Sequence, residues 1–263
     1  MAGSLLYVAT GLLVGLLIGV SGIGSGSVMT PLLVLGFGQS PSVAVGTDLV
    51  FSAATKLVAG VDLGYVRRID WGVVRALARG SVPAAGAAAL WLYFSRHSPP
   101  ALDGLTARAL AVALVITGIA LLCHRHIRQL GLQATAASLA SAQRLQPFAT
   151  LIAGVLVGVA VALTSVGAGT LGCVALLYLY PLRLSGERLI ATDIAHALPL
   201  TLVAAIGHVA LGPTNLPLLG SLLLGSIPGV LLGTRVAPRL PQGLLRTLIA
   251  ALLTLAGLRL LIA

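Results

Sequence analysis

Two glycine-rich stretches, GIGSGS at residues 22–27 and SVGAGT at residues 165–170, decide how this chain can fold. Each interrupts an apolar run and is followed by a short apolar segment, at residues 28–38 and 170–182. Helices of that length would measure only about 16–20 Å, whereas the hydrocarbon core of a bilayer is roughly 30 Å thick. The short segments cannot span a membrane alone. Each break therefore predicts a helical hairpin that turns back within the membrane.

The composition around the two breaks is that of an integral membrane protein. Of 263 residues, 58% are hydrophobic and 8% are charged, and the mean hydropathy is +1.06. Soluble domains carry roughly 25% charged residues, so soluble enzymes, disordered chains and coiled coils are excluded. Runs such as residues 12–20 are apolar on every face, which disfavours the alternating strands of a β-barrel. The sequence predicts an all-α polytopic membrane protein, with further apolar segments at residues 5–23, 43–63, 71–95, 106–123, 148–166, 188–211, 216–236 and 244–262.

The two breaks belong to an internal repeat. With an offset of 143, GLLVG at residues 11–15 matches GVLVG at residues 154–158. With an offset of 145, GTDL at 46–49 matches ATDI at 191–194 and GSVP at 80–83 matches GSIP at 225–228. Chance similarity of apolar sequences does not reproduce Gly, Thr, Asp and Pro in one order. We therefore divide the chain into a first repeat at residues 1–124, a cytoplasmic linker at 125–147 and a second repeat at 148–263.

Loop charge predicts that the two repeats have opposite orientations. The net charge is +10, but the basic residues stand at the ends of apolar runs, as in cytoplasmic loops, so nucleic acid is not an expected partner. Four arginines lie between residues 67 and 79, whereas the equivalent turn at 207–215 has no Lys or Arg. Each repeat is then a glycine-broken hairpin plus three transmembrane helices, and the second repeat has inverted topology, as in many secondary transporters. The predicted cytoplasmic loops are 64–70, 124–147, 183–187 and 237–243, and the predicted external loops are 39–42, 96–105 and 208–215.

These motifs resemble the TauE/SafE sulfite exporter family. The resemblance covers nearly the whole chain and is carried by the GIGSGS break followed by Pro31, AVGT at residues 44–47, RRIDW at 67–71 and the Gly80/Pro83/Gly86 spacing. It implies export of sulfite, organosulfonates or other small anionic compounds through a bacterial inner membrane by a multi-pass protein. The sequence departs from the family pattern at Ser25, which interrupts a glycine triplet, and at the acidic residues Asp48 and Asp193 that follow a threonine.

The chemistry of the hairpin tips also predicts an anion site. A helix that begins after a glycine-rich break directs its unpaired N–H groups and positive dipole end at the gap, and two such tips would meet near the midplane. Glycines let the backbone approach a ligand, and hydroxyls add donors. The alternative is that the glycines only allow close helix packing. The predicted substrate-binding residues are Gly24, Ser25, Gly26, Ser27, Thr47, Gly167, Ala168, Gly169, Thr170 and Thr192.

Ionisable residues within apolar segments are costly, so they predict function. Asp48 and Asp193 occupy equivalent positions in the repeats, and His196 lies one turn after Asp193. These three residues are the predicted proton-coupling groups. The alternatives are a helix N-cap for the two acids and a hydrogen-bonded packing role for His196. Lys56 either attracts the substrate or pairs with Asp62 or Asp48.

The sequence therefore predicts a secondary transporter that exports a small oxyanion such as sulfite, sulfoacetate or another organosulfonate. Transport is expected to be proton-coupled, with the substrate held at the midplane by backbone amides of the tips. The alternatives are an anion channel and an intramembrane hydrolase that uses His196, Asp193 and Ser165. No cofactor and no metal site are predicted, since CHRH at residues 123–126 is typical of a membrane-surface flank. The expected partners are the anion, the lipid bilayer and protons, and a homodimer is left open.

Overall fold

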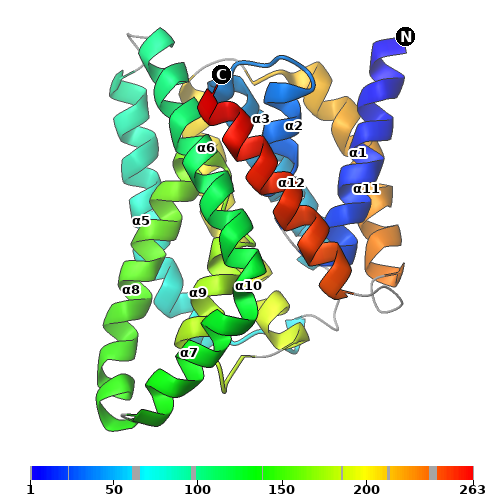
Figure 1. The fold of residues 1–263 in the computed structure, drawn as a ribbon. Coiled ribbons are helices and arrows are strands. Elements are labelled where there is room, and N and C mark those ends of the chain that lie inside the picture. The colour runs from blue at the N-terminus through cyan, green and yellow to red at the C-terminus, as the bar shows by residue number, and fades with distance from the viewer. Residues whose placement is uncertain are drawn as a thin grey trace.

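The computed structural model describes residues 2–22, 24–60, 66–95, 99–137, 139–184, 186–211, 214–236 and 242–262, and every element in these ranges is a helix (Figure 1). The ten apolar segments of the sequence each correspond to one helix. Most ends agree within a few residues, but the helices that contain segments 106–123 and 148–166 begin at Pro99 and Leu139. The elements are α1 (Ala2–Ser21), η1 (Ser25–Ser27), α2 (Met29–Leu35), α3 (Pro41–Gly60), α5 (Trp71–Phe94), α6 (Pro99–Leu122), α7 (His124–Ala137), α8 (Leu139–Thr164), α9 (Leu171–Leu179), α10 (Glu187–Leu211), α11 (Leu216–Val236) and α12 (Gln242–Ile262).

Five of the described helices are long and apolar enough to cross a membrane, which confirms an all-α membrane protein. They lie within α6, α8, α10, α11 and α12. Many large hydrophobic side chains on these helices are exposed, including Leu156, Leu224 and Leu255. A lipid environment accounts for such a surface, because soluble monomers rarely expose large contiguous apolar areas.

Each glycine-rich break is followed by a short helix, as the sequence predicts. Helix α2 has 7 residues and α9 has 9 residues. In Figure 1, α1 runs down from the N-terminus and the chain turns back upward through α2, whereas α8 runs up from the lower end and the chain returns downward through α9. The two hairpins therefore point toward each other from opposite ends of the molecule.

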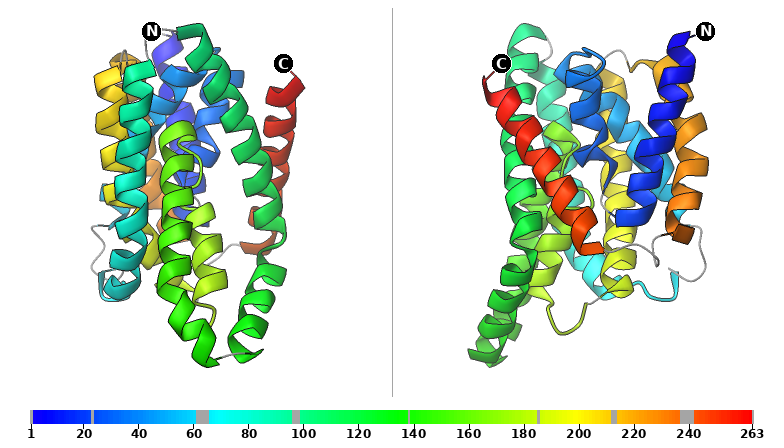
Figure 2. Two further views of the ribbon diagram at one scale, coloured as in Figure 1. Left: turned by 90° about the vertical axis from the view of Figure 1, so that its left-hand side faces the viewer. Right: turned by 45° about the vertical axis from the view of Figure 1, so that its right-hand side comes forward.

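The long arm of each hairpin packs against the other repeat. Helix α1 lies along α11, and α8 lies along α5 (Figure 2). Glycines permit the close approach: a Cβ atom at Gly15 would lie 2.4 Å from the Ser226 carbonyl oxygen, and one at Gly158 would lie 2.3 Å from the Ser81 carbonyl oxygen. Small residues at helix contacts are the usual means of tight packing in membranes. The two repeats are thus interlocked and do not form two separate bodies.

The segment between the repeats is helical. Helix α7 and the beginning of α8 occupy the predicted linker at residues 125–147, and α7 packs against α9. At this contact a Cβ atom at Gly131 would lie 2.4 Å from the Tyr178 carbonyl oxygen. The linker therefore packs against the short helix of the second hairpin.

Candidate functional site

The two hairpin tips touch each other through their backbones in the middle of the molecule. A Cβ atom at Gly24 would lie 2.0 Å from the Ala168 carbonyl oxygen, and one at Gly26 would lie 1.8 Å from the Ser165 carbonyl oxygen. Such distances exclude any side chain at these glycines unless the backbone moves. Gly24 and Gly26 therefore allow the tips to approach each other, and at these two positions the packing alternative describes the structure.

The side chains of the tips extend this contact. The hydroxyls of Ser27 and Thr170, which are 143 positions apart, are buried and lie 3.4 Å from each other. Val28 and Val166, one beside each tip, belong to the same buried apolar cluster. The prediction that the two tips meet is borne out by these contacts.

The tip backbones also adopt left-handed conformations at equivalent positions. Gly22 has φ +65° and Ser165, its match at an offset of 143, has φ +59°. Gly167 and Gly169 have φ +113° and +128°. A non-glycine residue in the left-handed region costs roughly 1–2 kcal/mol, so the contacts of the Ser165 side chain must offset that cost.

Those contacts are made to Asp48. The Asp48 Oδ2 atom accepts hydrogen bonds from Thr30 Oγ1 at 2.6 Å and from Ser165 Oγ at 2.7 Å. Asp48 thus ties α3 to the first hairpin and to the tip of the second. Its Oδ1 atom has no hydrogen-bond partner among the described residues, and Ser25 lies close to the same carboxylate.

The second acid, Asp193, has a different environment. It is fully buried, and its Oδ1 atom has no partner in the described part of the chain. A Cβ atom at Gly172 would lie 2.3 Å from this oxygen, and Cys173 contacts the same carboxylate. Both acids lie well inside their helices, since α3 begins at Pro41 and α10 at Glu187. The N-cap alternative is therefore wrong for Asp48 and Asp193.

The structure places His196 and Lys56 near the acids without forming ion pairs among the described residues. His196 Nε2 lies 2.7 Å from Ser81 Oγ on α5, and its Nδ1 atom has no described partner. Lys56 Nζ donates to Ser52 Oγ and lies in the electrostatic field of both Asp48 and Asp193. The other suggested partner of Lys56, Asp62, falls outside the described residues.

The hydrolytic arrangement of Ser165, His196 and Asp193 is not assembled. The Ser165 hydroxyl donates to Asp48, and the His196 imidazole is engaged with Ser81. A nucleophile needs its base within hydrogen-bond reach, and here the suggested nucleophile and the suggested base are each engaged with another residue.

A small cavity of about 40 Å³ lies beside the tip contact. Its walls include Lys56, Asp193 and Ser25, together with the tip residues Gly24 and Gly169. Since a site for one water needs roughly 10–15 Å³, this cavity has room for a few waters. It therefore brings one cation, one carboxylate and one hydroxyl together at the tips.

A larger vestibule of about 550 Å³ adjoins this cavity. The two spaces share Gly22, Gly169 and Ile190. The vestibule wall carries Arg125 and Arg128 from α7 and Arg246 from α12. Arg125 belongs to the CHRH stretch, which the sequence predicts to be a membrane-surface flank. The route from the tips to this end of the molecule is thus lined by basic residues.

The two predicted threonines of α3 and α10 differ in position. Thr47 is fully buried beside Asp48, and its Oγ1 atom has no described partner. The Thr192 hydroxyl donates to the Arg188 carbonyl at 2.7 Å and accepts from the Asp70 amide at 3.1 Å. The Thr192 hydroxyl thus joins α10 to the start of α5.

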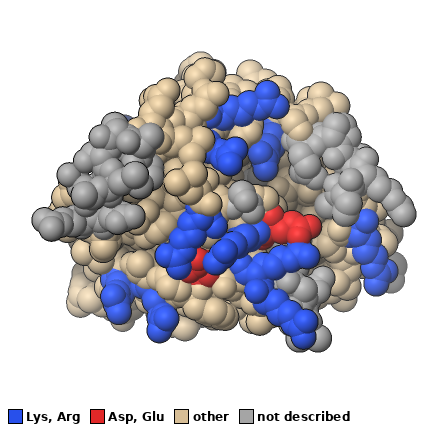
Figure 3. All heavy atoms as spheres, turned by 90° about the horizontal axis from the view of Figure 1, so that it is seen from below, with Lys and Arg blue, Asp and Glu red and all other residues tan. Residues whose placement is uncertain are grey.

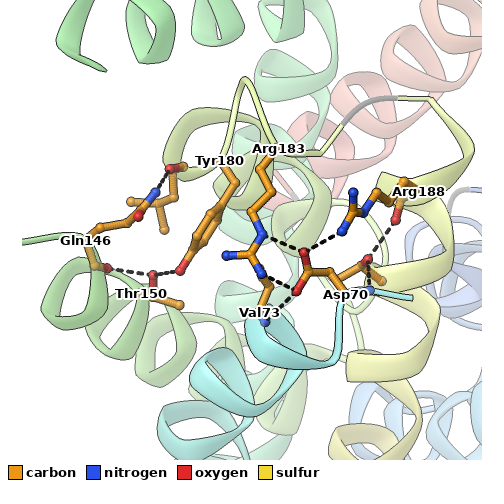
Figure 4. A network of polar contacts seen from close by, with 9 residues as sticks. Asp70, Val73, Gln146, Thr150, Tyr180, Arg183 and Arg188 are labelled. Carbon is orange, nitrogen blue, oxygen red and sulfur yellow. Dashed lines mark hydrogen bonds and ion pairs between the residues drawn. The ribbon is translucent and has the colours of Figure 1, made fainter. Parts of the chain in front are cut away.

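The Asp70 contact is part of an ionic network that the sequence did not reveal (Figure 4). Arg183 donates to both carboxylate oxygens of Asp70, at 2.6 and 2.8 Å, and Arg188 donates at 3.0 Å. The Val73 amide, at the start of α5, also donates to Asp70 at 3.3 Å. Burial opposes ionisation of Asp70, but the hydrogen bonds and positive charges hold the pKa of this carboxyl below its usual value. The RRIDW motif therefore anchors the loop between α9 and α10.

Comparison with known proteins agrees with the resemblance seen in the sequence. The model of the family described as "Sulfite exporter TauE/SafE" matches residues 7–260. The "Probable membrane transporter protein YjnA" of Bacillus subtilis (strain 168) is 34% identical over 224 residues, which cover 82% of this chain and 83% of that protein. No solved structure matches the chain. This multi-pass membrane protein is a transporter and not an enzyme, and it belongs to the TauE/SafE sulfite exporter family.

Proposed function

We propose that this protein is a secondary transporter that exports small oxyanions, such as sulfite, sulfoacetate or other organosulfonates, and that it binds them where the two hairpin tips meet. The observation that carries the proposal is the small cavity at the tips, which Lys56 and Ser25 line together with the tip glycines Gly24 and Gly169. A buried ammonium group beside oriented hydroxyls and backbone amides is suited to an oxyanion. Because the cavity holds only a few waters, the tips must separate to admit the substrate.

Paired contacts support an inverted-repeat architecture. The approach of Gly15 to Ser226 has its counterpart in the approach of Gly158 to Ser81, and these positions are related by offsets of 143 and 145 residues. Ser27 and Thr170, also 143 apart, touch each other. A pseudo-two-fold axis in the membrane plane, passing between these two hydroxyls, would relate both pairs of contacts.

The charge distribution supports an orientation with the vestibule on the cytoplasmic side. Figure 3 shows basic side chains gathered over the lower face of the molecule, and three arginines line the vestibule that leads from there to the tips. Cytoplasmic loops of membrane proteins are enriched in Lys and Arg. In this orientation the substrate would enter from the cytoplasm, which is the direction that export requires.

Proton coupling is the part of the proposal that rests on the two buried acids. Asp48 and Asp193 each have one carboxylate oxygen without a described partner, and both lie in the field of Lys56. Adding or removing one proton at this cluster changes the charge offered to an anion. Because α1 packs on α11 and α8 on α5, the moving units would combine helices from both repeats.

Flux from proteoliposomes tests the transport proposal. We expect saturable efflux of sulfite or sulfoacetate, whereas a channel would show no saturation in the same range. Lys56→Met should reduce efflux by at least about tenfold, since it removes a buried charge-assisted donor. The matched control is Arg75→Gln, an exposed residue of α5 whose bond is to its own helix. Equal efflux from Lys56→Met and the wild type would contradict the proposal that the substrate binds at the tips.

Cysteine labelling tests the inverted topology. Single cysteines at Gln39 and Leu182, placed in a background with Cys123→Ala and Cys173→Ala, should label from opposite sides of sealed vesicles. Labelling of both from one side would mean that the hairpins cross the membrane fully, and the inverted-repeat architecture would be wrong.

A further inference from the structure

The vestibule below the tips is lined by basic and by apolar side chains. The basic ones are Arg125, Arg128 and Arg246. The apolar ones include Leu121, Leu132, Val174, Leu177, Leu189 and Ile190. Within the described residues, no Asp or Glu lines this space. A cavity of this kind is suited to a ligand that is anionic at one end and apolar at the other.

The three arginines have no carboxylate partner in the part of the chain that the structure describes. The recorded ion pairs join Arg183 and Arg188 to Asp70 and join Arg68 to Glu187. Arg125 and Arg128 are exposed and Arg246 is half-buried, so their guanidinium groups remain available to a ligand. Guanidinium groups bind sulfonate, carboxylate and phosphate oxygens in a two-pronged manner.

His124, which also lines the vestibule, lies in the electrostatic field of two of these arginines. His124 Nδ1 lies 2.9 Å from the Leu121 carbonyl oxygen. Burial lowers the pKa of His124, and the charges of Arg246 and Arg125 lower it further, against the effect of the Leu121 carbonyl. These two arginines, from α12 and α7, therefore act on one point of the vestibule wall.

We infer that the vestibule contains a second anion-binding site, separate from the tips, for an organic oxyanion that bears a short apolar chain. The head binds at Arg125, Arg128 and Arg246, and the chain lies against the leucines. This inference deepens the proposed function and rests on it only for its place on the transport route. The site would hold an alkanesulfonate more tightly than sulfite, because sulfite has no carbon chain to bury. It would load the transporter before the tips open.

Isothermal titration calorimetry on the purified full chain, in detergent with phosphatidylcholine, tests this site directly. The probes are ethanesulfonate, butanesulfonate and hexanesulfonate. We expect affinity to rise by up to about fourfold for each methylene group that becomes buried. Arg125→Gln combined with Arg128→Gln should weaken binding of every probe by at least about tenfold, through the loss of charge-assisted hydrogen bonds. Arg75→Gln, at an exposed position outside the vestibule, should bind like the wild type.

Two further variants separate this inference from the proposed function. Lys56→Met should retain the alkanesulfonate binding seen by calorimetry although its efflux is reduced. Leu177→Thr should reduce the dependence of affinity on chain length. If the wild type transports no oxyanion but binding still requires the arginines, the proposed function fails and the vestibule site stands. If transport is saturable but the double arginine variant binds the probes normally, the vestibule site is overturned alone. Binding of phosphatidylglycerol without binding of any sulfonate would also overturn it, because the arginines would then be a lipid site.

Discussion

Asp48 and Asp193 occupy equivalent positions in the two repeats but are held in different ways. Asp48 accepts two short hydrogen bonds, from Thr30 in the hairpin of the first repeat and from Ser165 in the tip of the second. Asp193 lines the small cavity beside Lys56, and its Oδ1 atom has no described partner. Asp48 therefore links α3 to both hairpins through hydrogen bonds, whereas Asp193 lines the cavity in which we place the substrate.

Matched residues of the two repeats account for the different contacts of Asp48 and Asp193. Thr30 corresponds to Cys173 and Ser165 corresponds to Gly22, both at an offset of 143. Gly22 and Ser165 share a left-handed backbone, so the fold of the tip was kept while the hydroxyl that would reach the second acid is missing. The two tips therefore share a backbone conformation at this position but differ in the side chains that can reach the two acids. We expect Asp193, and not Asp48, to be the principal proton-coupling residue.

The largest effect should come from disrupting the tip contact, to which Asp48 is hydrogen-bonded and beside which Asp193 lies. Gly26→Leu places atoms where the Ser165 carbonyl now lies, since even a Cβ atom would be 1.8 Å from it. We expect efflux to fall at least about 100-fold and the melting temperature to fall with it, because overpacking costs typically 1–3 kcal/mol. Gly169→Leu should behave similarly, because its φ of +128° is unfavourable for any side chain.

The control for these variants is Gly104→Ala, at a helical position where a Cβ atom has no neighbour within 4 Å. It should transport like the wild type. If Gly26→Leu also transported normally, the tips would not form the substrate site, and the comparison of the two acids would lose its basis.

Substitution of each acid by its amide separates the two roles. Asp193→Asn removes a titrating group from the cavity, so we expect substrate binding to survive while the pH dependence of efflux is lost. Asp48→Asn should retain the pH dependence but lower the melting temperature, since hydrogen bonds to a charged group contribute roughly 1.5–3 kcal/mol. Efflux measured from pH 5 to pH 8, together with thermal unfolding, distinguishes the two results. An unchanged pH profile of efflux in both variants would contradict the proposal that these residues couple transport to protons.

Exchanging the matched tip residues should give a smaller effect. Ser165→Gly removes one hydroxyl from Asp48, at a cost of about 1–3 kcal/mol for an unsatisfied buried partner. Glycine also relieves the left-handed backbone, which returns roughly 1 kcal/mol. We therefore expect a net loss near 1 kcal/mol, measured as a modest fall in melting temperature. A large loss would show that Ser165 does more than fasten Asp48.

The reverse change, Gly22→Ser, offers a hydroxyl to the cavity that Asp193 lines. We expect it to shift the pH profile of efflux without abolishing transport, because a new hydrogen bond favours one protonation state. The serine Cβ would lie 3.2 Å from Ile190, so Gly22→Ala serves as the steric control. The same shift in both variants would mean that the hydroxyl has no part in it.

The sequence predicted much of this fold but little of how its parts touch. Ten apolar segments and two glycine breaks correspond to helices and tips, because helix length and composition are local properties. The packing of α1 on α11 and of α8 on α5 was not predicted, since a repeat shows which segments are equivalent and not which are neighbours. The pairing of Arg183 with Asp70 joins residues 113 positions apart, and no local pattern marks it. Thr192 matches Thr47 in the repeat, but its hydroxyl also accepts from the Asp70 amide, a contact that no local pattern marks.

A second pair of matched residues extends the comparison beyond the membrane interior. Asp70 caps α5 through the Val73 amide at 3.3 Å, and Asn215, at an offset of 145, caps α11 through the Leu218 amide at 3.2 Å. The cap is therefore common to both repeats. Of the two capping residues, Asp70 is the acidic one, and it alone forms ion pairs, with Arg183 and Arg188. Asp70 lies at the end of the predicted cytoplasmic loop at residues 64–70.

Asp70→Asn makes the two caps alike and should have the smallest effect. Asparagine caps helices as well as aspartate does, so the substitution removes mainly the ion pairs. Both arginines are about half exposed, and solvent screening limits the loss to about 1 kcal/mol or less. Because the pKa of folded Asp70 lies below its usual value of 3.8, its contribution is fully present above about pH 4 and is lost as the pH falls through the lowered pKa. The melting temperature of the variant should therefore lie slightly below that of the wild type at pH 7, and the two should converge as the pH falls below 4 or as salt is added. A difference that grows at low pH would contradict this assignment, because it would require a contribution from the protonated carboxyl.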